Sequence, residues 1–150
     1  MKMGKGKGSD KHKRMQRDMY KMLREMGYLV IIEPAFDGRN ADLLIHDINT
    51  LETVIIEIEF HKNYHHAIKS IESDLRFGNV VIVFCDSETI KDALYRLSAK
   101  LEKPDRQRVH FVLTNQYIYF IRTLFQNKDN NNIHNRTRNN IRTQERRNHG

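Results

Sequence analysis

The sequence of 150 residues contains a single cysteine and no apolar run long enough to cross a bilayer. One cysteine cannot form a disulfide within the chain, so no disulfide framework exists and we expect a reducing, cytoplasmic setting. A membrane span needs about 18 apolar residues in a row, and the basic start of the chain is not followed by the apolar segment of a signal peptide. We therefore expect one soluble domain with its own core and no membrane partner.

Positive charge is concentrated near the two ends of the sequence. Residues 1–27 carry nine Lys and Arg against three acidic residues, and residues 126–150 carry six against two, whereas the middle is mildly acidic. Basic segments of this kind gain affinity for polyanions by releasing counterions from phosphates. Solubility alone is the competing explanation for basic ends.

Hydrophobic periodicity predicts alternating helices and strands. A first helix begins after Ser9 or Asp10 and ends at Gly27, with a buried stripe of Met15, Met19, Met22, Leu23 and Met26. The later segments are a strand in "YLVIIEP", two strands in 41–60 around a polar turn, a helix from Asn63 to Gly78, a strand in "NVVIVFC", a helix over 88–103 and a strand in "VHFVL". The hydrophobic periodicity of "QYIYFIRTLF" fits either a strand or a short helix.

This order predicts an α/β domain, a mixed sheet with helices on both faces, because a buried strand is reached through a helical crossover. We expect a flexible basic arm over residues 1–8, the folded domain over 9–125 and a disordered Asn- and Arg-rich basic tail over 126–150. No internal repeat is visible.

The stretch "TVIIEIEFHK" places Glu57 and Glu59 on one face of a strand, since side chains alternate. If the preceding hairpin turns at Asn49 and Thr50, paired residues have numbers that sum to 99, and Asp42 lies opposite Glu57. Three carboxylates on one face repel each other unless water or a cation relieves them. If this face is covered, oxygen ligands of this kind suit Mg²⁺ or Mn²⁺. A shift of one residue would send Asp42 to the other face.

With its leading helix, "GRNADLLI" and "VIIEIEF", the chain resembles the restriction-endonuclease-like superfamily, the PD-(D/E)XK nucleases, over residues 9 to about 85. The layout is most similar to archaeal Holliday-junction-resolvase-like small nucleases. The resemblance implies an αβββαβ core and metal-dependent hydrolysis of DNA. Asp42 takes the place of the family's Asp, and Glu57 that of the first acid of its pair. A homodimer is a candidate assembly because dimers are common for this fold.

The chain departs from the family pattern at two positions. Glu59 stands where the family's lysine is usual, although some restriction enzymes carry Glu there, and Gln16 stands where resolvases carry a metal-associated Glu. Glu33 is a candidate substitute ligand, and Lys62 is a candidate source of positive charge at the strand end, with ordinary surface exposure as the competing explanation for both. We therefore expect the metal ligands Asp42, Glu57 and Glu33 with Mg²⁺ or Mn²⁺. The expected catalytic residues are Asp42, Glu57, Glu59 and Lys62. Cations expected to contact DNA are Lys11, Lys13, Arg14, Arg17 and Arg39.

Two functions therefore stay open. The first is a metal-dependent DNA endonuclease, in which the metal activates water and Glu59 takes a proton from it or shares the metal. The second is a DNA-binding or partner-binding module of the same fold with weakened catalysis, serving as a subunit of a DNA-processing assembly.

Other motifs give weaker signals. His61, His65 and His66 are spaced like zinc ligands, but a strand end and a helix cap separate them. Tyr117 and Tyr119 offer either core packing or a stacking surface.

Overall fold

The computed structural model describes residues 10–60 and 62–125. The predicted basic arm, the predicted tail and His61 lie outside these ranges. The chain divides into two compact units, Met1–Asn115 and Gln116–Gly150, which are described separately. In the second unit, residues 117–125 are helical, which resolves the choice that periodicity had left open.

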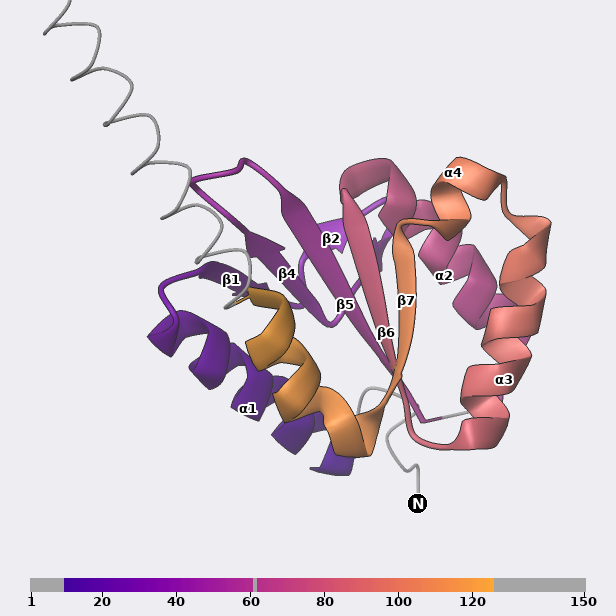
Figure 1. The fold of residues 1–150 in the computed structure, drawn as a ribbon, viewed down its shortest axis with the longest axis horizontal. Helices are drawn as coiled ribbons and strands as arrows, with labels where there is room; N and C mark the ends of the chain where they lie inside the picture. Colours follow the sequence, from indigo (N-terminus) through magenta and orange to yellow (C-terminus); the bar gives the residue numbers. More distant parts are fainter. Residues whose placement is uncertain (1–9, 61, 126–150) are drawn as a thin grey trace, which may run out of the picture. The chain divides into compact units, whose positions relative to one another are not determined.

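In the first unit, the strands β1 to β5 follow helix α1, and helices then separate the remaining strands (Figure 1). Its helices are α1 (Asp10–Glu25), α2 (Tyr64–Phe77), α3 (Glu88–Leu97), α4 (Lys103–Arg106) and the 3₁₀ turn η2 (Ser98–Lys100), and a further turn, η3 (Thr114–Gln116), follows the last strand. Its strands are β1 (Leu29–Ile32), β2 (Ala35–Phe36), β3 (Arg39–Asn40), β4 (Leu43–His46), β5 (Thr53–Glu59), β6 (Val80–Cys85) and β7 (Val109–Leu113).

Five strands form one mixed sheet in the order β1-β4-β5-β6-β7. Neighbours are antiparallel from β1 to β5 and parallel from β5 to β7, because α2 and α3 provide the two crossovers. Strands β2 and β3 pair separately in the connection between β1 and β4. The predicted mixed sheet flanked by helices, with its αβββαβ order, is confirmed: α1, β1, β4, β5, α2 and β6 form that core.

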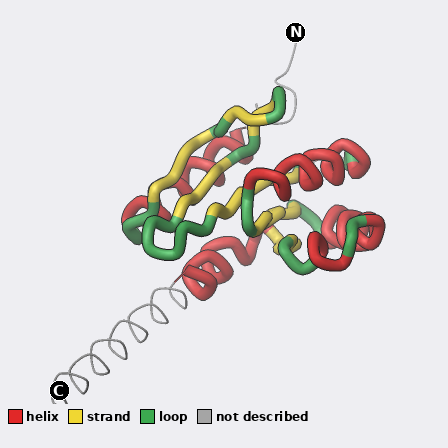
Figure 2. The backbone as a smooth tube through the Cα atoms, turned by 90° about the horizontal axis from the view of Figure 1, so that it is seen from above, coloured by secondary structure: helices red, strands yellow, loops and turns green. Residues whose placement is uncertain are grey.

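The sheet carries helices on both faces, as the ribbon and the view from above both show (Figures 1 and 2). On one face, Ile55, Val83 and Cys85 pack in a core cluster with Ile71 of α2 and Leu94 of α3. The alternate residues of the same strands, such as Ile56, Ile82 and Phe84, are fully buried toward the other face. Helix α1 covers that other face.

The buried stripe of α1 differs from the predicted one. Its buried side chains are His12, Gln16, Met19 and Leu23, spaced i, i+4, i+7 and i+11. Met15, Met22 and Met26 are only partly buried. The helix is therefore rotated relative to the expectation, and the first two positions of its inner face are polar.

The single helix predicted over 88–103 is also corrected. Helix α3 ends at Leu97, and α4 begins with Pro104 in its first turn. Between them lie the 3₁₀ turn η2 and Leu101, whose extended backbone (φ −74°, ψ 152°) interrupts the helix before it reaches Pro104. The predicted cap of α2 is confirmed, since the Asn63 side chain accepts the N–H of His66.

Gly78, predicted to end α2, does so without a left-handed backbone. A Cβ at this position would lie 3.0 Å from the side chain of Ile55. Because the chain passes this close to the sheet, a larger residue would have to displace the Ile55 side chain.

Among the helices of the described residues, none has the length and apolarity that a bilayer crossing requires.

The thiol of Cys85 lies in the interior of β6. Burial, together with the nearby Glu59 carboxylate, raises its pKa to about 12, against a smaller opposing effect of Lys91. The thiolate is the reactive form, and at pH 8 its fraction is about 10⁻⁴. We expect iodoacetamide at pH 8 to leave Cys85 unmodified in the folded protein and to alkylate it fully in denaturant, as measured by mass spectrometry. Rapid alkylation of the folded protein would contradict this placement.

Candidate functional site

The predicted register of the β4–β5 hairpin is confirmed, because Leu43 pairs with Ile56 and Ile45 with Val54. Asp42 is where the regular ladder stops. Its N–H donates to the carbonyl of Ile56 (3.2 Å), the residue already paired with Leu43. Asp42 therefore lies just outside the regular strand, where the alternation of side chains no longer fixes the face that its carboxylate takes.

The carboxylate of Asp42 is enclosed by α1 and β5. One oxygen lies 3.0 Å from Nε2 of His12, and the other accepts the N–H of Ile58 (2.7 Å). Asp42 is fully buried and His12 is 2% exposed. Gln16 donates its side-chain amide to the Asp42 carbonyl (2.9 Å). The two polar residues at the start of the buried α1 stripe, His12 and Gln16, therefore both contact Asp42.

Glu57 is held by an arginine rather than by the first helix. Nη1 of Arg39 lies 3.2 Å from Oε1 of Glu57, while Nη2 pairs with Asp74 and donates to the carbonyl of Ser70 (2.6 Å). Glu57 and Asp74 are 3% and 0% exposed. The Arg39 guanidinium also lies over the ring of Phe36, 5.6 Å from its centroid. One cation thus bridges a strand carboxylate and a helix carboxylate in the interior.

The carboxylates of Asp42 and Glu57 consequently contact different partners. The expectation that they share one face is wrong in this respect, although the register behind it is right. Asp42 reaches His12 of α1, and Glu57 reaches α2 through Arg39. Within residues 10–60 and 62–125, no group of three or more His, Cys, Asp and Glu side chains is arranged to hold a metal ion.

The other predicted ligands and catalytic residues lie around this pair. Glu33 is exposed, with a φ of +50°, and its N–H donates to the Asp42 carbonyl (3.0 Å). Glu59 is half-buried at the end of β5, and Lys62 is exposed. Their metal-binding and catalytic roles stay predictions. His65 and His66 are exposed in the first turn of α2.

The predicted DNA contacts fall into two groups. Lys13, Arg14 and Arg17 are exposed on the outer face of α1 and have no carboxylate partner in the part of the chain that the structure describes. Lys11 pairs with Asp86 (2.7 Å). Arg39 instead lies in the interior charge network.

Sequence reasoning missed His12 and Asp74. His12 was detectable, because it continues the i, i+4, i+7 stripe backward from Met19 and Gln16. Asp74 stands on the inner face of α2 between Ile71 and Leu75, and a carboxylate among apolar neighbours signals a buried partner.

A scan of protein-family models and a search of curated proteins returned no match for this sequence. A search of solved structures returned a crystal structure of a repair endonuclease from Pyrococcus abyssi, with 15% sequence identity and a TM-score of 0.45. The match covers 70% of this chain and 47% of that chain, so this chain spans about half the length of that protein.

Proposed function

We propose that this chain is a DNA-binding module of the restriction-endonuclease-like type that holds DNA without cutting it. The proposal is carried by one observation: side chains of the protein itself contact both carboxylates that match the family motif, Asp42 and Glu57. Arg39 neutralises Glu57, and His12 with the N–H of Ile58 engages Asp42. Such a module serves as a subunit of a DNA-processing assembly.

The residues as arranged do not fit a Mg²⁺ or Mn²⁺ ion. These ions take several oxygen ligands that converge on one point. Here the Asp42 oxygens are directed to α1 and to a backbone N–H, and Glu57 is paired with a guanidinium that also carries Asp74. A metal between Asp42 and Glu57 would have to displace the Arg39 cation from the buried Glu57.

The outer face of α1 is the DNA-binding surface in this proposal. Lys13 and Arg17 are one helical turn apart, and Arg14 lies beside them, so their charges follow one side of the helix. Exposed Lys and Arg without acidic partners bind phosphates with little sequence preference.

The proposal predicts that DNA binds and stays intact in the presence of Mg²⁺ or Mn²⁺. Changing Lys13, Arg14 and Arg17 together to glutamine should weaken duplex binding about 100-fold and lower the slope of log K against log salt by about 2 to 3. Fluorescence anisotropy over a salt series measures both, and a gel of the same samples reports cleavage. The matched control changes Lys69, Lys91 and Arg96 to glutamine, which removes the same charge from α2 and α3. Equal losses in both variants would contradict the assignment of α1.

A metal-dependent endonuclease is the second candidate. It is favoured by the position of Asp42, whose carboxylate accepts the N–H of the residue directly after Glu57. This function requires Glu57 to leave Arg39 when substrate binds. Cleavage by the wild-type protein that is lost in both Asp42→Asn and Glu57→Gln would establish this candidate and reject the first.

A further inference from the structure

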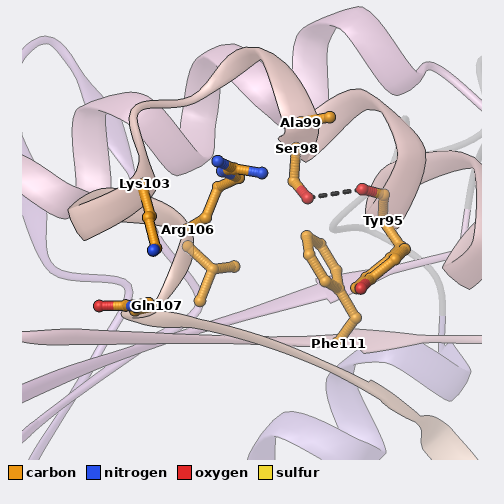
Figure 3. A pocket seen from close by; sticks show the side chains of 8 residues that line it. Tyr95, Ser98, Ala99, Lys103, Arg106, Gln107 and Phe111 are labelled. Carbon is orange, nitrogen blue, oxygen red and sulfur yellow. Dashed lines mark hydrogen bonds between the residues drawn. The ribbon is translucent and has the colours of Figure 1, made fainter.

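A cavity of about 300 Å³ lies between α3, η2, α4 and β7, apart from the residues discussed above (Figure 3). Its lining combines aromatic, cationic and amide side chains, chiefly Tyr95, Phe111, Lys103, Arg106 and Gln107. No aspartate or glutamate lines it. Its size is at the lower end of pockets that accept small organic ligands.

One end of the cavity is aromatic. The rings of Tyr95 and Phe111 meet edge to face with centroids 6.4 Å apart. Tyr95 is 70% exposed, so much of its ring is available to a ligand. Behind it, the buried Ser98 donates its hydroxyl to the Tyr95 carbonyl (2.6 Å), which fixes the helix end that carries the ring. Figure 3 shows this bond beside the two rings.

The other end is cationic. Lys103 and Arg106 are exposed, and neither has a carboxylate partner among the described residues. The acid of this short helix, Asp105, pairs with Arg108 (2.8 Å). Arg108 in turn donates to the carbonyls of Leu75 and Gly78. Asp105 therefore pairs with Arg108, and the cavity keeps the positive charges of Lys103 and Arg106.

We propose that this cavity binds one unpaired nucleotide of a single-stranded DNA, with the base against Tyr95 and Phe111 and the phosphate at Lys103 and Arg106. An aromatic surface stacks any base, and Lys and Arg bind phosphate oxygens. The Gln107 amide offers both a donor and an acceptor to the edge of the base. The inference rests on the proposed function for the choice of DNA as partner, but its residues are separate from those of α1.

Isothermal titration of the full chain with dAMP, the tetranucleotide d(A)₄, adenosine and inorganic phosphate tests the proposal. We expect d(A)₄ to bind, and the double variant Lys103→Gln with Arg106→Gln to bind it at least 10-fold more weakly. Tyr95→Ala, at an exposed position, should weaken binding about 10-fold by removing a stacking surface. The control variant Arg96→Gln with Lys100→Gln, which carries the same charge change outside the cavity, should keep the wild-type affinity.

Binding of dAMP as well as d(A)₄ would support a site for the nucleotide unit, and binding of d(A)₄ alone would support a site that needs the strand. Inorganic phosphate binding as tightly as d(A)₄ would overturn the proposal, because stacking would then contribute nothing. An unchanged affinity in Tyr95→Ala would overturn it as well.

The cavity variants should keep the duplex affinity of the wild type, and the α1 triple variant should keep the affinity for d(A)₄ within about threefold. A failure of the cavity proposal is thus distinguishable from a failure of the proposed function.

Discussion

Replacing Arg39 with methionine is expected to lower the free energy of unfolding by about 3 to 5 kcal/mol, the usual cost of removing one partner from a buried ion pair. Methionine keeps much of the apolar length of the side chain but leaves Glu57 and Asp74 without their shared cation. Both acids are almost fully buried, so water cannot replace the guanidinium. Urea denaturation followed by circular dichroism measures the loss.

The matched control is Arg76→Met. Arg76 is 66% exposed and lies 3.5 Å from Asp37, and a surface pair of this kind contributes less than about 1 kcal/mol. The double variant Arg39→Met with Glu57→Gln should recover part of the lost stability, because it removes one of the two stranded charges. A similar loss for Arg39→Met and Arg76→Met would show that the interior network contributes nothing to stability.

Replacing Asp42 with alanine is expected to cost about 2 to 5 kcal/mol. The change leaves His12 and the N–H of Ile58 in the interior without the oxygens they face, and each such group costs about 1 to 3 kcal/mol. Asp42→Asn keeps an acceptor for the Ile58 N–H and should cost clearly less.

Thermal and urea unfolding of the two variants measure the difference. Asp86→Ala is a control at another aspartate that pairs with a cation, since its partner Lys11 is 62% exposed. A loss in Asp42→Ala no greater than in Asp86→Ala would mean that Asp42 is kept for a purpose other than stability. That outcome would favour the endonuclease candidate.

The order of elements and the pairing of the β4–β5 hairpin were predictable, because both depend on local signals. Polar turn residues between two apolar runs set the register, and the register holds from Leu43 to His46. The direction of Asp42 was not predictable, since alternation applies within a regular strand and Asp42 lies just before the first residue of β4.

The pairing of Glu57 with Arg39 could not be predicted from the sequence either. Arg39 is 18 residues from Glu57 and 35 from Asp74 in the sequence, and no local period connects them. The sequence indicated that acids would gather in the hairpin and that water or a cation had to relieve them. It did not distinguish a bound ion from the arginine of β3, because the partner of Glu57 is determined by tertiary contacts and not by local sequence.

Strand β5 lies between an antiparallel neighbour and a parallel one. Pairing with β4 closes residues 47–52, whereas pairing with β6 must close residues 60–79, which include α2. The longer closure costs about 1 kcal/mol more in chain entropy, so the hairpin has the shorter path to its contacts. The contact between Arg39 and Asp74 waits for α2 to dock. Interactions that form after the rate-limiting step slow unfolding more than they speed folding. If α2 docks after that step, we expect the loss of Arg39 to speed unfolding more than it slows folding, so that the arginine would act chiefly on how long the domain stays folded.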